Sequence, residues 1–186
     1  MSPLLRGSFG SPYTYIARCA STQLLLAPEA QEGAFAITDE QTAGRGRLGR
    51  RWHAPAATSI LCSLALRPPH PVARWPELSL VAGEACAEAI GGITGVATAI
   101  KPPNDVLIGA RKLAGILAEA CDGRVVLGIG INVNVTADAL REQAGTAAIS
   151  LLAETGLRHD RAALLVAVLE HLERRYSAWR TGLSSP

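Results

Sequence analysis

Lysine is almost absent from this chain of 186 residues: it occurs only at Lys101 and Lys112, and arginine is used everywhere else. The two side chains are not equivalent, because lysine carries a compact point charge and arginine a planar, delocalised one. The two lysines are therefore candidates for places where an ammonium must sit beside a reacting group. Chance retention of two lysines is the alternative.

Acidic residues are missing between Glu40 and Glu77, and this gap contains a run that alternates glycine with arginine, Gly44 to Arg51. Arginine forks suit carboxylate and phosphate, and glycine lets the backbone approach a ligand closely. No acid nearby in the sequence neutralises the guanidinium groups, so the run predicts an anion-binding loop. Leu48 is nearly its only apolar residue, so we expect the loop to be mobile when empty and ordered when occupied. A solvated basic loop without a ligand is the alternative.

The run also matches G-x-G-x-x-G through Gly44, Gly46 and Gly49, but a dinucleotide site is not indicated. That fingerprint needs a helix that starts at the motif and an acidic residue about twenty positions later. Here Pro55 blocks a helix and the next acid is Glu77. No Gly-Lys-Ser/Thr sequence follows, so the run is not a P-loop.

Cysteine pairs of the C-x-x-C type are also missing. The sequence shows no secretory leader and no apolar run long enough to cross a membrane. The four cysteines are far apart and predict buried thiols in a reducing compartment, so we expect a cytoplasmic protein. The net charge is only +2, which makes the basic loop a local feature and argues against a general nucleic-acid binder. The length predicts one domain over residues 1–186.

Short β-prone runs alternate with turn signals over the first two thirds of the chain, and helical patterns follow. We expect an N-capped short helix after Ser21-Thr22. Longer helices are expected at 75–92, from 148 and after 160, and the expected strands cover 13–16, 34–38, 58–66, 97–101, 106–108, 113–120 and 124–135. Glycines inside the last strand, Gly128 and Gly130, indicate either close approach of a ligand or a bulge. The pattern predicts an α+β fold, a mixed and mostly antiparallel sheet with helices packed on one side.

Four polar motifs fall at strand ends or turns: Gln41 to Trp52, Lys101-Pro102-Pro103-Asn104-Asp105, Arg111 to Leu117, and Gly130-Ile131-Asn132. Together they resemble the catalytic domain of biotin–protein ligases, whose pattern is G-R-G-R-x-G-R-x-W, K-W-P-N-D, K-L-A-G-I-L and G-x-G-x-N. The similarity spans roughly residues 13 to 180. It implies the class II aminoacyl-tRNA synthetase-like fold of that domain.

The resemblance also implies a two-step reaction. Biotin and ATP with Mg²⁺ give biotinoyl-adenylate and pyrophosphate, and the adenylate then acylates a lysine of a biotin carboxyl carrier domain. Two anions must meet in the first step, and cationic groups that hold both offset their repulsion. Arg45, Arg47 and Lys112 are the catalytic candidates.

The remaining roles are carried over from the family motifs. The predicted biotin-binding residues are Ser21, Thr22, Gln23, Gln41, Gly44, Arg45, Gly46, Arg47, Lys112, Gly115, Gly128 and Gly130. The predicted ATP-binding residues are Arg50, Trp52, Lys101, Asn104, Asp105 and Asn132. Asp105 is also the candidate Mg²⁺ ligand, because this ion prefers oxygen donors; a turn-capping aspartate is the alternative.

Several positions depart from the family pattern. Pro102 replaces the tryptophan of K-W-P-N-D, and Gln23 stands where asparagine is usual. We expect no N-terminal DNA-binding domain, hence no DNA partner, and no C-terminal β-domain; a homodimer is possible. Two other functions stay open: a lipoate or octanoate transferase of the same fold, which would lack the arginine-glycine loop, and a non-catalytic relative that still holds biotin.

Overall fold

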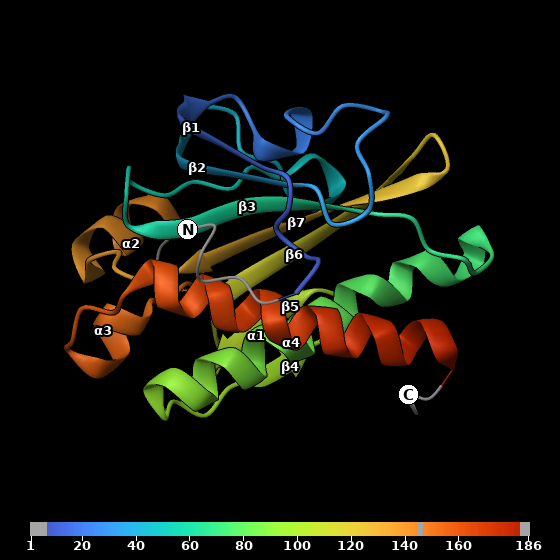
Figure 1. Cartoon of the computed structure of the whole chain (residues 1–186). Helices are drawn as coiled ribbons and strands as arrows, with labels where there is room; N and C mark the ends of the chain where they lie inside the picture. The colour runs from blue at the N-terminus through green and yellow to red at the C-terminus, as the bar shows by residue number, and fades with distance from the viewer. Residues whose placement is uncertain (1–6, 145–146, 183–186) are drawn as a thin grey trace.

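Seven strands form one sheet in the computed structural model, which describes residues 7–144 and 147–182. Their order across the sheet is β1-β2-β3-β7-β6-β5-β4 (Figure 1). β1 and β2 run parallel, and the other neighbouring pairs are antiparallel. The strands are β1 (Tyr13–Cys19), β2 (Phe35–Gln41), β3 (Ser59–Leu66), β4 (Ala99–Lys101), β5 (Asp105–Ile108), β6 (Arg111–Cys121) and β7 (Arg124–Asn132).

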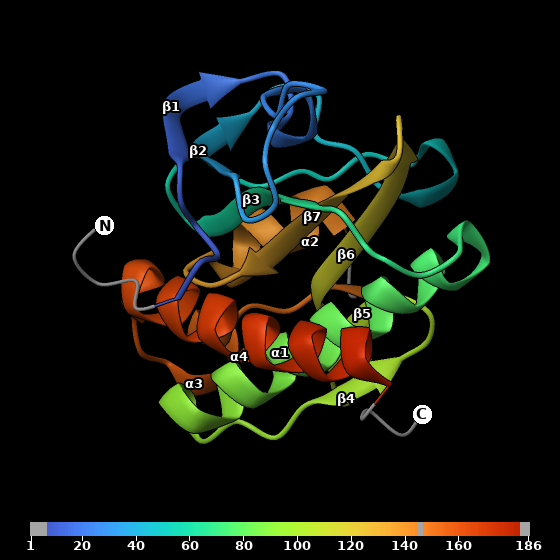
Figure 2. The same ribbon diagram turned by 45° about the vertical axis from the view of Figure 1, so that its right-hand side comes forward.

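Two long helices, α1 (Leu78–Thr94) and α4 (Arg161–Thr181), lie side by side along one face of this sheet (Figures 1 and 2). In α4 the apolar side chains recur every three to four residues, so one stripe is buried against the sheet and α1. Asp160 caps the start of α4 by accepting from the amides of Ala162 and Ala163. The predicted mixed sheet with helices on one side is therefore confirmed.

Local differences from the predicted elements have identifiable causes. The segment after Ser21 is a single 3₁₀ turn, η2 (Thr22–Leu24), and the Ser21 side chain makes no capping hydrogen bond. The helix expected at 75–92 begins as a 3₁₀ helix, η4 (Val72–Glu77), since Pro76 lacks the amide for regular α-helical bonding. It ends only at Gly95, which takes the left-handed conformation at φ 71°.

Two short helices connect the sheet to α4. Helix α3 (Leu151–Thr155) starts at Ser150, whose hydroxyl accepts from the amide of Ala153, and agrees with the predicted helical start near 148. Helix α2 (Ala137–Ala144) was not predicted. It is only eight residues long and Leu140 is its one large apolar side chain, so there is no extended apolar stripe to detect.

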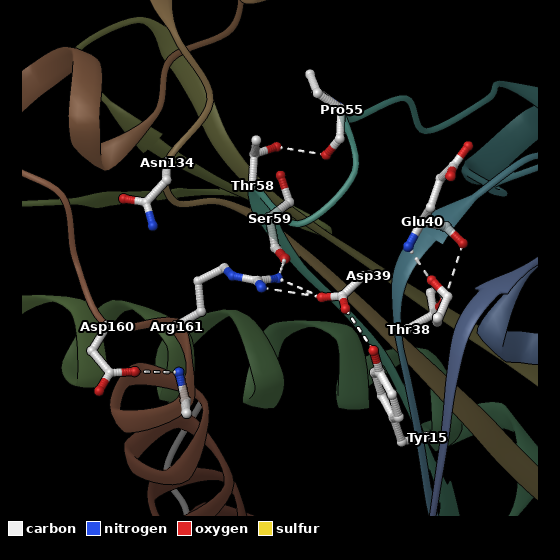
Figure 3. A network of polar contacts seen from close by, with 12 residues as sticks. Tyr15, Thr38, Asp39, Glu40, Pro55, Thr58, Ser59, Asn134, Asp160 and Arg161 are labelled. Atoms are coloured by element: carbon white, nitrogen blue, oxygen red, sulfur yellow. Dashed lines mark hydrogen bonds and ion pairs between the residues drawn. The ribbon is translucent and has the colours of Figure 1, made fainter.

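Polar contacts tie the start of α4 to three strands (Figure 3). The guanidinium of Arg161 donates to the Asp39 carboxylate at 3.1 Å and to the carbonyl of Ser59 at 3.0 Å. Tyr15 of the edge strand donates its hydroxyl to the other oxygen of Asp39, at 2.7 Å, and this hydrogen bond raises the pKa of Tyr15. The network holds β2 in place two residues before Gln41.

A second polar cluster joins the outer faces of the two long helices. Arg175 of α4 pairs with Glu84 and Glu88 of α1, and His171 lies 2.7 Å from Glu88. The hydrogen bond from Arg175, aided by His171, lowers the pKa of Glu88 to about 2. The cluster fastens α1 and α4 together at their exposed side.

The four cysteines are free thiols in different surroundings. Cys62 and Cys86 are buried, and burial raises the pKa of Cys86 to about 12. Cys121, in contrast, is exposed on the β6–β7 hairpin and Cys19 is half-buried. The prediction of buried thiols is therefore wrong for Cys121, because a strand end at a hairpin has no layer above it. No helix in the described ranges combines the length and the apolar character that a membrane span needs.

Candidate active site

Three glycines form a floor, free of side chains, on the sheet face opposite α1 and α4. Gly115 of β6 pairs with Gly130 of β7, and Gly128 lies two positions along the same strand, so all three share one face. The neighbouring Ile116 points the other way, toward Gly83 of α1. The floor is therefore on the side that the long helices leave open.

Side chains lie so close above the floor glycines that a Cβ on these glycines would clash with them or touch them closely. A Cβ on Gly130 would lie 2.7 Å from Cε2 of Trp52, and one on Gly128 would lie 3.2 Å from the carboxamide of Gln23. The register of β7 with both neighbours is continuous, so the bulge interpretation of these glycines is wrong. They provide space above the sheet.

Polar residues from η2 and the end of β2 form one wall of the cavity above the floor. Ser21, Thr22 and Gln23 are buried, and they line the cavity with Gln41. The amide of Thr22 donates to Oε1 of Gln41 at 2.8 Å, and its hydroxyl lies 2.8 Å from the hydroxyl of Ser63 on the floor strand β3. The Ser21 hydroxyl is buried with no partner among the described residues, so capping does not explain it. Cys62, Leu117 and Ile129 complete the lining.

The glycine-arginine loop closes over the rim of the cavity. Its backbone folds back on itself, with the amide of Gly46 bonded to the carbonyl of Arg50 at 2.8 Å and that of Trp52 to Gly44 at 3.0 Å. A 3₁₀ turn, η3 (Arg47–Gly49), forms its tip, and Leu48 there is 86% exposed. The loop thus has backbone order but no apolar anchor at its tip.

Two arginines of this loop find partners from distant strands. Arg45 forms an ion pair with Glu119 of β6, at 2.9 Å between Nη2 and Oε1. Arg47 donates to Oδ1 of Asn104 at 3.3 Å. The expectation that nothing neutralises these guanidinium groups is therefore wrong for Arg45, because the β6 strand delivers an acid that lies 74 positions later in the chain.

Lys112 lies where the loop, the floor and β5 meet. Its ammonium is 2.7 Å from Oδ1 of Asp105 and 5.6 Å from the ring centre of Trp52. A Cβ on Gly115 would lie 2.9 Å from Nζ, so the ammonium stands directly over the floor. Lys112 and Asp105 are partly exposed, and both remain within reach of a ligand.

Two further hollows adjoin the cavity. Trp52 lines the cavity and both hollows, and Lys112 lines both hollows. One is lined by Arg51, Trp52, His53, Lys112, Asn132, Leu140 and Ala148. The other contains Arg45, Gly46, Arg47, Arg50, Asn104 and Asp105 beside the same lysine. Asn132 donates to the carbonyl of Ile149 and Asn104 to that of Ile116, which fixes both amides. The indole N–H of Trp52 is buried and has no partner among the described residues.

The predicted site residues thus converge, except that two of them line none of these three hollows. Lys101 is exposed on β4, whereas Gly44 is buried in the loop against the carbonyl of Trp52 and the side chain of Gln41.

Residues outside the prediction also line these hollows, among them Cys62, Ile129 and Leu140. Ser63 and Glu119 contact lining residues without lining a hollow themselves. Glu119 could have been found, because it follows Gly115 and Leu117 with the period of two that keeps strand residues on one face.

A basic loop over a glycine-floored cavity, with a lysine between two adjoining hollows, is an arrangement suited to holding two anionic ligands side by side. The chain belongs to the biotin/lipoate A/B protein ligase family, whose model matches residues 15–136. This agrees with the predicted resemblance to biotin–protein ligases.

Curated and solved relatives point in the same direction. The chain is 41% identical over 157 residues to the bifunctional ligase/repressor BirA of Bacillus spizizenii, covering 82% of this chain and 48% of that protein. It is 39% identical over 174 residues to the biotin–[acetyl-CoA-carboxylase] ligase of Mycobacterium tuberculosis, covering 89% and 64%. The chain spans about half the length of the BirA proteins that it matches.

The fold itself matches a solved biotin protein ligase from Aquifex aeolicus, described in complex with biotin and ATP. The TM-score is 0.81 at 30% identity, and the match covers 92% of this chain and 72% of the other.

Proposed function

We propose that the chain activates biotin with ATP and transfers the biotinoyl group to a lysine of a biotin carboxyl carrier domain. The observation that carries this proposal is the position of Lys112, over the glycine floor of one cavity and at the border of the hollow lined by Trp52 and Asn132. A carboxylate in the first and a nucleotide phosphate in the second would meet beside its ammonium. The related ligases named above support the choice of biotin.

In the first step an oxygen of the biotin carboxylate attacks the α-phosphorus of ATP, and the bond from that phosphorus to the bridging oxygen breaks. Pyrophosphate leaves with its electron pair, and biotinoyl-adenylate remains. In the second step a carrier lysine amine attacks the acyl carbon, AMP leaves and the amine loses a proton. Holding both reactants in one site is itself a large part of such catalysis.

The cavity under the loop is the proposed biotin site. Ser21, Thr22, Gln23 and Gln41 supply hydrogen-bonding groups at its closed end, and Gly115, Gly128 and Gly130 supply the floor. The ureido ring of biotin would lie at the polar end and its carboxylate near Lys112. Gly44 and Gly46 allow the loop backbone to approach the ligand.

The adjoining hollows are the proposed ATP site, where Arg45, Arg47 and Lys112 offset the charge of the two anions. Arg50, Trp52, Asn104 and Asn132 line them. The role of Lys101 in nucleotide binding stays a prediction, because its exposed side chain lies outside these hollows.

Asp105 fits a Mg²⁺ ion that travels with ATP. Its carboxylate borders the arginine-lined hollow, and Mg²⁺ is commonly held by one or two carboxylates together with phosphate oxygens. The described residues contain no cluster of three or more ligand side chains, so the phosphates would supply most of the coordination. The ion would offset negative charge on the leaving pyrophosphate. We also propose a cytoplasmic location, which fits the free thiols.

Pyrophosphate release from ATP in the presence of biotin, lipoate or octanoate tests the function. We expect release with biotin and little with the other two acids. Equal or greater release with lipoate would contradict the biotin assignment. Biotin binding without release would instead indicate a non-catalytic biotin-binding protein.

A further inference from the structure

Glu119 holds two residues of the cavity wall at once, although it does not line the cavity itself. Its Oε2 accepts from Nε2 of Gln23 at 2.9 Å, and its Oε1 is 2.9 Å from Nη2 of Arg45. Gln23 comes from η2 and Arg45 from the glycine-arginine loop, so one carboxylate of β6 joins two segments that are separate in the chain.

The carboxylate determines which end of the Gln23 amide faces it. An ionised carboxylate only accepts hydrogen bonds, so Gln23 must present its NH₂ group. The carbonyls of Val126 and Leu117 lie 3.3 and 3.5 Å from the same nitrogen and favour the same orientation, but Glu119 is the nearest of the three acceptors and the charged one. Together they leave the amide oxygen pointing elsewhere.

That oxygen lies over the cavity floor without a partner. A Cβ on Gly128 would be 3.2 Å from Oε1 of Gln23, which is buried and accepts no hydrogen bond from any described residue. Gln23 is only 9% exposed, so solvent reaches it poorly. A buried acceptor without a donor costs free energy, and a ligand that brings an N–H group removes this cost.

We propose that Glu119 is a positioning and specificity-determining residue: it orients Gln23 so that the cavity selects a ligand with an N–H donor, and it holds Arg45 at the rim. This inference rests on the proposed function, for which the N–H donor is a ureido nitrogen of biotin. Glutamine is one methylene longer than the asparagine of the family pattern, and the extra length lets the amide reach Glu119.

Two substitutions separate the two contacts. Glu119→Gln keeps an oxygen that can accept from Gln23 but removes the charge that pairs with Arg45. Glu119→Ala removes both contacts. Glu32→Gln is the matched control, because Glu32 is also a partly exposed acid paired with one arginine, Arg180, and it lies outside the cavity.

The first measurement is the ratio of dissociation constants for biotin and for biotin methylated on a ureido nitrogen. We expect Glu119→Ala to reduce this discrimination about tenfold relative to the wild type, the effect of losing one buried hydrogen bond. Glu119→Gln should retain most of it, and Glu32→Gln all of it. A general structural defect would weaken both ligands alike and leave the ratio unchanged.

The second measurement needs no ligand: amide hydrogen exchange of residues 44–51 in the empty protein. Both Glu119 variants should exchange faster than the wild type and Glu32→Gln should not. The proposed role of Glu119 would be overturned if both variants had the wild-type ratio of dissociation constants and the wild-type exchange rates. That result would not affect the proposed function, because the protein would still bind biotin. If the wild type fails to bind biotin, the proposed function fails, and the exchange data alone decide whether Glu119 holds Arg45.

Discussion

Lys112 is the residue on which the proposed chemistry depends most directly. Its ammonium is held between Asp105 and the Trp52 ring, over the floor glycine Gly115. We predict that Lys112→Ala lowers the rate of biotin-dependent pyrophosphate release at least about tenfold, the loss of roughly 1.4 kcal/mol of transition-state stabilisation.

The neighbouring cation provides a matched control for this prediction. Arg111 precedes Lys112 but points to Glu154, with which it forms an ion pair at 3.2 Å. Arg111→Ala should leave pyrophosphate release within about twofold of the wild type, since losing an exposed ion pair typically costs under about 1 kcal/mol. Equal losses in both variants would show that general charge or stability, not the position of Lys112, controls the rate.

Residue types identified most of the site from the sequence, but not the pairings within it. Glycine and arginine at Gly44 to Arg51 correctly indicated a basic loop, whereas the counter-ion Glu119 was missed because sequence distance was taken for spatial distance. The local pattern at Ser21 indicated only a helix cap, and its predicted place in the site came from the family resemblance; its side chain is buried and makes no capping hydrogen bond. Contacts of this kind depend on strand order and register, which local patterns do not contain.

At the scale of elements, α1 and α4 pack against each other and cover the face of the sheet opposite the cavity. The apolar stripe of α4 was read correctly from its helical period, and so was the last strand with its glycines. Helix α2 was missed, yet its Leu140 borders the hollow proposed for the nucleotide. A helix of eight residues with one large apolar side chain leaves little signal, because a helix this short is stabilised mainly by tertiary contacts.

The cluster at the outer face of these helices makes stability depend on pH. The pKa of Glu88 is lowered from the ordinary 4.5 to about 2, so its ion pairs stabilise the fold above about pH 4.5. This contribution is lost as the pH falls from 4.5 towards 2, because over that range the unfolded chain binds a proton at Glu88 that the folded protein does not bind. We predict that Glu88→Gln unfolds more easily than the wild type at pH 7, by less than about 1 kcal/mol for such an exposed cluster.

Urea unfolding followed by circular dichroism at pH 7, 4.5 and 2.5 measures this difference. The gap between wild type and Glu88→Gln should stay nearly constant from pH 7 to about 4.5 and then shrink between pH 4.5 and 2.5. Glu142→Gln changes an exposed acid of α2 and should show no pH-dependent gap. A gap that stays constant down to pH 2.5 would mean that packing of the side chain, and not its charge, stabilises the helix pair.

At the scale of the whole molecule, the sheet order explains how motifs from position 21 to position 132 form one site. β3, β7 and β6 are neighbours, so their facing residues Ser63, Gly128 and Leu117 lie in one row beneath η2. The fold class could be predicted from the order of strand and helix patterns in the sequence. The row of residues could not, because it depends on the register between the paired strands. The family resemblance supplied what the pattern alone could not.

The tip of the glycine-arginine loop is exposed and has no apolar anchor, so its order should depend on ligand. Its tip has Leu48 exposed and in the left-handed region at φ 58°, a conformation that bulky residues rarely adopt. Ordering each residue costs roughly 1–2 kcal/mol of backbone entropy, and the partly exposed Arg45–Glu119 pair offsets only a small part of it. Bound biotin and nucleotide would add anions that several arginines can contact together.

We therefore predict that the amides of residues 45–50 exchange faster than those of β3 and β7 in the empty protein, and slow markedly when biotinoyl-adenylate is bound. Hydrogen exchange with and without the adenylate measures this change, and the β7 amides serve as the internal reference. Arg45→Gly should also speed escape of the adenylate into solvent, because it removes a guanidinium at the rim of the cavity. If the empty loop is already as protected as the neighbouring strands, the site is rigid and preformed, and ligand binding does not depend on ordering the loop.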